Sequence, residues 1–168
     1  MTPAPKRAAP VAVKRERALP IELTKWAGTE RHTERNNAHE LASKIGMQNT
    51  VLFSDMGGHR SAGLFLYNTH PIDASRFIME LGGNDAHKGV MRASELVKEK
   101  MSQNTKGGFA IDAAEFVTRF RPEGAALLVR THGAEKVRTH FRELIALKKK
   151  ETKENSHLTF RAAEKILK

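Results

Sequence analysis

Apolar residues recur three and four positions apart along most of this chain, and glycine or proline ends most of these runs. This spacing places the apolar side chains on one face of an α-helix. The first clear case covers residues 37–45, where Asn37 and Glu40 have the spacing of a capping box at a helix start. The pattern therefore predicts a fold dominated by short amphipathic helices.

Further helices are predicted by the same spacing together with start and stop signals. They begin at Asp73, at Asn84 or Asp85, at Asp112, at Pro122 and at Ala134, and a weaker period covers residues 158–167. Proline lacks the backbone N–H that a helix interior needs, so one helix must end before Pro122 and the next begins there. The helix from Ala134 is expected to continue to Lys150 as one long amphipathic element.

Two short runs have the composition of strands. Residues 50–53 and 64–67 are apolar with β-branched or aromatic side chains, and a glycine-containing linker separates them. We therefore expect an α+β fold that is mainly α-helical: one compact domain with a short β-hairpin or helix-turn-helix segment, flanked by basic tails. The expected boundaries are a disordered basic arm at 1–20, a globular domain at 21–147 and a partly helical basic extension at 148–168. No repeat with a period of roughly 20 to 50 residues is visible.

The segment 37–56 resembles a helix-turn-helix, with Gly46 at the turn and a second helix over 48–56. The resemblance implies that the second helix lies in the DNA major groove. The side chains that would then face bases or phosphates are Gln48, Asn49, Thr50 and Ser54. Asp55 departs from the motif, because an apolar residue is usual at its position. The hairpin interpretation also remains open, because residues 50–53 favour a strand.

A third arrangement involves the run 64–67 and the two helices that follow it. The order strand, helix, helix resembles a ribbon-helix-helix protein, which reads DNA through a paired two-stranded ribbon in a dimer. Such a ribbon needs one polar face for the bases, whereas residues 64–67 are apolar on both faces. The run fits a hairpin better than a DNA-reading ribbon.

The net charge of +10 is concentrated at the two ends of the chain. Residues 1–20 contain five Lys or Arg and one Glu, and residues 130–168 contain eleven Lys or Arg and five Glu, whereas residues 21–129 are neutral. Basic ends favour a polyanion, because each neutralised phosphate releases condensed counterions. A basic surface that serves only solubility is the simpler alternative. The arm is expected to be disordered because it is rich in proline and contains no aromatic residue.

The predicted nucleic-acid contacts lie in the arm, in the centre and on the basic face of the helix at 134–150. The segment 57–60 could touch the DNA backbone, although it lacks the spacing of a phosphate-binding loop. The predicted contacts are Lys6, Arg7, Lys14, Arg15 and Arg17 in the arm, Lys44, Gln48, Asn49, Thr50, Ser54, His59 and Arg60 in the centre, and Arg130, Lys136, Arg138, Arg142, Lys148, Lys149 and Lys150 towards the C-terminus.

Several chemistries find no support in the residue pattern. The chain has no cysteine, its eight histidines include no HExxH motif, and no GxSxG elbow is present. We therefore expect no catalytic residues, no metal and no cofactor. No apolar run approaches the roughly 20 residues that cross a bilayer, and no secretory signal is recognisable, so we expect a cytoplasmic protein without a membrane partner, nucleoid-associated if bacterial.

The expected function is that of a non-catalytic protein that binds double-stranded DNA, such as a transcriptional regulator or an accessory factor of a mobile element. Paired half-sites are common for such proteins, which makes a homodimer plausible. The alternatives are an RNA-binding protein that uses the same basic surfaces, and a protein-interaction adaptor with solubilising basic tails. An enzyme that acts on a phosphorylated substrate through residues 57–60 ranks below these.

Overall fold

The computed structural model describes residues 32–98 and 108–168, and this part of the chain is helical without any strand. The predicted α+β fold is therefore wrong, and so is its β-hairpin. Residues 50–53 lie in α4 (Met47–Gly57), and residues 64–67 lie in α5 (His59–Thr69). The β-propensity of these runs is overridden by tertiary packing, because Phe53 and Phe65 are fully buried when each run is helical.

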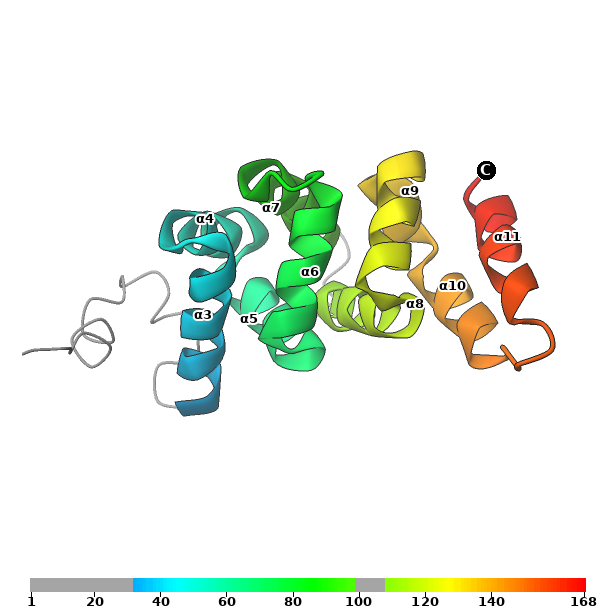
Figure 1. Cartoon of the computed structure of the whole chain (residues 1–168), viewed down its shortest axis with the longest axis horizontal. Helices are drawn as coiled ribbons and strands as arrows, with labels where there is room; N and C mark the ends of the chain where they lie inside the picture. Colours follow the sequence, from blue (N-terminus) through cyan, green and yellow to red (C-terminus); the bar gives the residue numbers. More distant parts are fainter. Residues whose placement is uncertain (1–31, 99–107) are drawn as a thin grey trace, which may run out of the picture.

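The helices follow one another along the long axis of the molecule, from α3 at one end to α11 at the other (Figure 1). The remaining elements are α3 (His32–Ile45), α6 (Pro71–Leu81), α7 (Ala86–Val97), α8 (Gly108–His132), α9 (Ala134–Thr139), α10 (Phe141–Lys149) and α11 (Ser156–Leu167). α8 consists of two helices, 108–120 and 122–132, because Arg121 has non-helical dihedral angles. We refer to them as the first and second halves of α8.

Several of the predicted helix starts and stops are correct. Asp85 caps α7 by accepting a hydrogen bond from the backbone N–H of Lys88, and Pro122 begins the second half of α8. Other expectations fail. α6 begins at Pro71 and not at Asp73, and the first half of α8 begins at Gly108 and not at Asp112. Asn37 lies inside α3 and is therefore not an N-cap, and the long helix expected from Ala134 is interrupted at His140.

Most neighbouring helices are joined by a single residue with positive φ. These joints, with φ in parentheses, are Gly46 (93°), Gly58 (91°), His70 (73°), Arg121 (71°) and Gly133 (93°). Glycine reaches this region without a Cβ clash, whereas other residues are strained there. Both non-glycine joints precede a proline, which disfavours a helical ψ in the residue before it. Proline therefore takes the place of glycine in ending the preceding helix.

The joints reveal an internal repeat of 12 residues, shorter than the periods considered from the sequence. The joints Gly46, Gly58 and His70 are spaced by 12 residues, and so are Arg121 and Gly133. Gly82, which follows α6 with φ of −93°, continues the first series. The residue eight positions before each of these six residues is small and fully buried, and the residue five positions before it is large and fully buried. The small residues are Ala38, Thr50, Ala62, Ala74, Ala113 and Ala125, and the large ones are Leu41, Phe53, Phe65, Phe77, Phe116 and Leu128.

Each helix packs on the third helix after it. α3 packs on α6, α4 on α7, and α5 on α8. The same relation continues towards the C-terminus: rings of the first half of α8 and α10 meet, with 5.6 Å between the centroids of Phe116 and Phe141. The second half of α8 meets α11 through His132 and Glu164. The chain is therefore an α-solenoid with three helices per turn, in which each turn contacts its neighbours.

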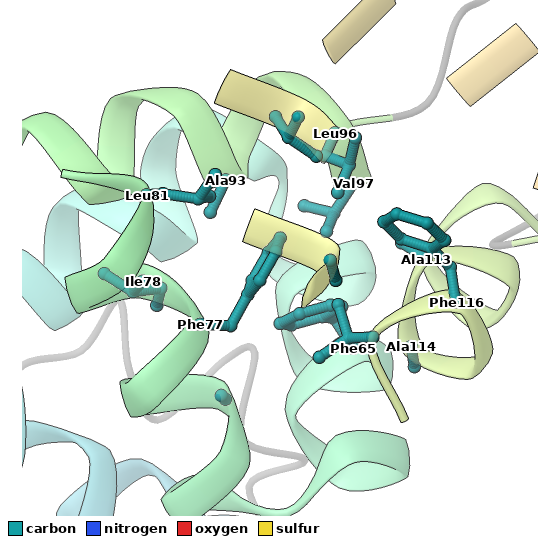
Figure 2. Close-up of a cluster of buried hydrophobic side chains, with 14 of the residues drawn as sticks. Phe65, Phe77, Ile78, Leu81, Ala93, Leu96, Val97, Ala113, Ala114 and Phe116 are labelled. Carbon is teal, nitrogen blue, oxygen red and sulfur yellow. The ribbon is translucent and has the colours of Figure 1, made fainter. Parts of the chain in front are cut away.

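The interior of the solenoid is filled by the large residues of successive repeats. The ring centroids of Phe53 and Phe65 are 5.9 Å apart, and those of Phe65 and Phe77 are 6.1 Å apart. Figure 2 shows side chains of α5, α6, α7 and the first half of α8 converging on this core. Because the interior is occupied, only the outer faces of the helices are available for binding.

Candidate nucleic-acid interface

The structure removes two of the central residues from the predicted DNA contacts. Thr50 and Ser54 are fully buried, because both occupy inward positions of the 12-residue repeat. The Thr50 hydroxyl donates to the carbonyl oxygen of Gly46 at 2.9 Å, and the Ser54 hydroxyl lies 2.6 Å from Nδ1 of His59. Neither side chain faces solvent, and we withdraw both from the interface.

The second helix implied by the helix-turn-helix resemblance is present as α4, but its outward side chains are few. Gln48 is exposed, whereas Asn49 is half-buried and donates through Nδ2 to the Ile45 carbonyl oxygen at 2.8 Å. The turn before α4 is the single residue Gly46. Asp55 is exposed on the same helix and adds negative charge there. Gln48 is thus the remaining candidate for reading bases on α4.

Two of the predicted central cations are accessible to a phosphate, whereas His59 contacts a buried side chain. Lys44 at the end of α3 and Arg60 at the start of α5 are both exposed. His59 is half-buried beside the Ser54 hydroxyl. The predicted arm at 1–20 lies outside the described residues, and its five contacts lie there with it: Lys6, Arg7, Lys14, Arg15 and Arg17.

Arg138 is buried, contrary to its predicted place on an outward basic face. α9 packs against both α7 and α8, which encloses Val137 and Arg138 together. The Arg138 guanidinium donates to the carbonyl oxygens of Glu95, at 2.5 Å, and of Lys98. It also lies 4.4 Å from the ring centroid of Phe109, and burial lowers its pKa. Arg138 therefore ties α9 to the C-terminal end of α7 and has no surface role.

Four of the predicted C-terminal cations have partners within the protein. Arg142 is 91% exposed, with Nε 3.7 Å from an Asp112 carboxylate oxygen, and Lys149 Nζ is 3.8 Å from Glu115. Lys136 Nζ donates to the backbone carbonyl of Lys168 at 3.0 Å. Lys148 donates to Glu151 at 2.8 Å, and this hydrogen bond lowers the pKa of the Glu151 carboxyl. Exposed pairs of this kind contribute little to stability, so Arg142 and Lys149 can exchange partners for phosphates.

Other C-terminal cations have no carboxylate within ion-pair distance among the described residues. They are Arg130, Lys150, Lys153, Arg161, Lys165 and Lys168, and all six are exposed. The predicted contacts included the first two and missed the other four. Arg161 and Lys165 could have been found from their i, i+4 spacing, since Ala163 and Leu167 of the same helix are buried.

In residues 32–98 and 108–168, no group of three or more His, Asp or Glu side chains could hold a metal ion. No helix described there is long and apolar enough to cross a membrane. Comparison of the chain with protein-family models, curated proteins and solved structures returned no match.

Proposed function

We propose that this protein is a non-catalytic nucleic-acid-binding protein that prefers duplex DNA, in the class of transcriptional regulators and mobile-element accessory factors. The observation that carries the proposal is the excess of positive charge in residues 130–168, where at least six exposed cations have no carboxylate partner among the described residues. Unpaired surface cations bind phosphates without first breaking an internal ion pair. The same proposal places the protein in the cytoplasm.

In this proposal the C-terminal cations supply salt-dependent affinity, and Lys44 and Arg60 add contacts on the central helices. Gln48 is the residue proposed to read bases, because an exposed amide can donate to and accept from an adenine edge. Dimerisation would pair two such surfaces on one site, and measurement of the molar mass in solution with and without DNA tests it.

The test is binding to duplex DNA, single-stranded DNA and RNA over a series of salt concentrations. The double variant Lys150→Gln with Lys153→Gln should lower the slope of log K against log salt by up to about 0.9 per lost phosphate contact on duplex DNA. The double variant Arg76→Gln with Arg119→Gln is the matched control, since it removes the same charge from two exposed side chains that are paired with Glu123 and Glu115 in the neutral part of the chain. Tighter binding to RNA than to duplex DNA would make RNA the proposed ligand. Absence of binding to all three nucleic acids at low salt would refute the proposed function.

One observation favours a protein-interaction adaptor as the second candidate. Repeat solenoids present extended surfaces to partner proteins. Here Tyr67 and Ile72 are large apolar side chains that are 50% and 52% exposed, on consecutive helices. If nucleic acids do not bind, retention of a protein partner that is lost in a Tyr67→Ser, Ile72→Ser variant would support this function.

A further inference from the structure

A groove lies on the outer surface between α7 and the joint that connects α8 to α9. Its volume is about 390 Å³, which is within the range of roughly 300–1,000 Å³ that is usual for ligand pockets. α7 contributes Met91, Arg92 and Glu95 to its walls. The other wall consists of Val129, Arg130, Gly133 and Ala134.

The two arginines give the groove its chemistry. Arg92 is held in place by a hydrogen bond of 2.5 Å from Nη1 to the carbonyl oxygen of Leu81, which leaves other N–H groups of the guanidinium for a ligand. Arg130 is exposed and has no carboxylate partner among the described residues. The only acid in the lining, Glu95, has its carboxylate 3.5 Å from Lys98 Nζ, which offsets its charge. Two guanidinium groups on facing elements suit a tetrahedral oxyanion.

Part of the groove lining is apolar. Val129 is buried, and Met91 is 39% exposed although it is a large apolar side chain. A thioether against an open groove offers a soft surface on which a sugar or a base can pack. The groove therefore combines two anion-binding side chains with an apolar contact for the group that carries the anion.

We propose that this groove binds one phosphate of a nucleic-acid strand between Arg92 and Arg130, with the adjoining nucleoside packed on Met91. The inference rests on the proposed function and adds to it a defined phosphate site within the solenoid. A free nucleotide offers the same chemistry, so the experiment must separate the polymer from the small molecule.

The experiment follows methionine methyl groups by NMR in the full-length protein. Met91 reports on the groove. Met47 on α4 is 36% exposed, lies outside the groove lining and directly precedes Gln48, so its signal reports separately on the proposed base contact. Duplex DNA, a mononucleotide and pyrophosphate are titrated separately. We expect duplex DNA to shift the Met91 signal at lower concentration than the mononucleotide does.

Arg130→Gln should abolish the shift of the Met91 signal and lower the salt slope of duplex binding by about 1. Arg161→Gln is the matched control, because Arg161 is also exposed without a carboxylate partner among the described residues and lies on α11. It should leave the shift of Met91 intact. The unfolding temperature of each variant shows whether it is folded.

The outcomes separate the groove from the wider proposal. Duplex binding without a shift of Met91, or with a shift that survives Arg130→Gln, overturns the groove while the proposed function stands. A shift with the mononucleotide or pyrophosphate but no duplex binding overturns both the proposed function and the polymer as ligand. No response to any of the three probes overturns the groove and the function together.

Discussion

Replacing Gly133 by alanine tests the joints on which the solenoid depends. Gly133 has φ of 93° and ψ of 150°, and no heavy atom lies within 4 Å of the place where a Cβ would be. The cost of the substitution is therefore conformational, roughly 1–3 kcal/mol for a non-glycine residue in this region. Alanine also restricts the unfolded chain, which offsets about 0.4–1 kcal/mol. We expect a net loss of about 1–2 kcal/mol.

The control is Gly124→Ala in the second half of α8. Its nearest neighbour would be Cε1 of Phe160 at 4.0 Å, an ordinary contact, and the helix favours alanine over glycine by up to about 1 kcal/mol. Urea and thermal unfolding followed by circular dichroism measure both variants. Gly133→Ala should lower the midpoint temperature of thermal unfolding by roughly 2–8 °C, while Gly124→Ala leaves this temperature unchanged or raises it. A Gly133→Ala variant as stable as the parent would refute the positive φ at this joint.

Three further substitutions test other features of the fold. Arg138→Met should lower the free energy of unfolding in urea by roughly 2–4 kcal/mol, because the carbonyls of Glu95 and Lys98 lose a charged donor. A variant that is as stable as the parent but binds DNA more weakly would contradict the structural role of Arg138. Arg121→Gly removes the backbone strain of a non-glycine residue at φ of 71° and should raise the free energy of unfolding by about 1 kcal/mol in the same assay. A lower free energy of unfolding would show that the Arg121 side chain is needed. Burial raises the pKa of the Asp112 carboxyl, so the folded state holds that proton more tightly than the unfolded state and stability falls as pH rises through the folded pKa. Asp112→Asn should remove this loss of stability, which begins above the ordinary aspartate pKa of about 3.9, and an unchanged pH profile would count against it.

Local signals in the sequence were enough to predict much of the secondary structure. Asp85 as a cap and Pro122 as a helix start act through the backbone of their own turn, so no distant residue is needed to recognise them. The concentration of positive charge near the C-terminus is likewise a property of the sequence. Of the two arginines in the groove, the sequence predicted Arg130 as a nucleic-acid contact and did not predict Arg92. Arg92 joins Arg130 through a packing of α7 on the α8–α9 joint that no local pattern encodes.

The sequence by itself determined where several helices begin and end, as at Asp85, Pro122 and Ala134, and where the charge lies, because short-range backbone chemistry and composition decide both. Only the tertiary structure decided that residues 50–53 and 64–67 are helical, since burying Phe53 and Phe65 on the consecutive helices α4 and α5 outweighs the preference of these residues for strands. It also decided that Thr50, Ser54 and Arg138 face inward. A side chain faces inward where a helix distant in the sequence packs on it, as α7 packs on α4 and on α9. Such contacts exist only in the folded chain.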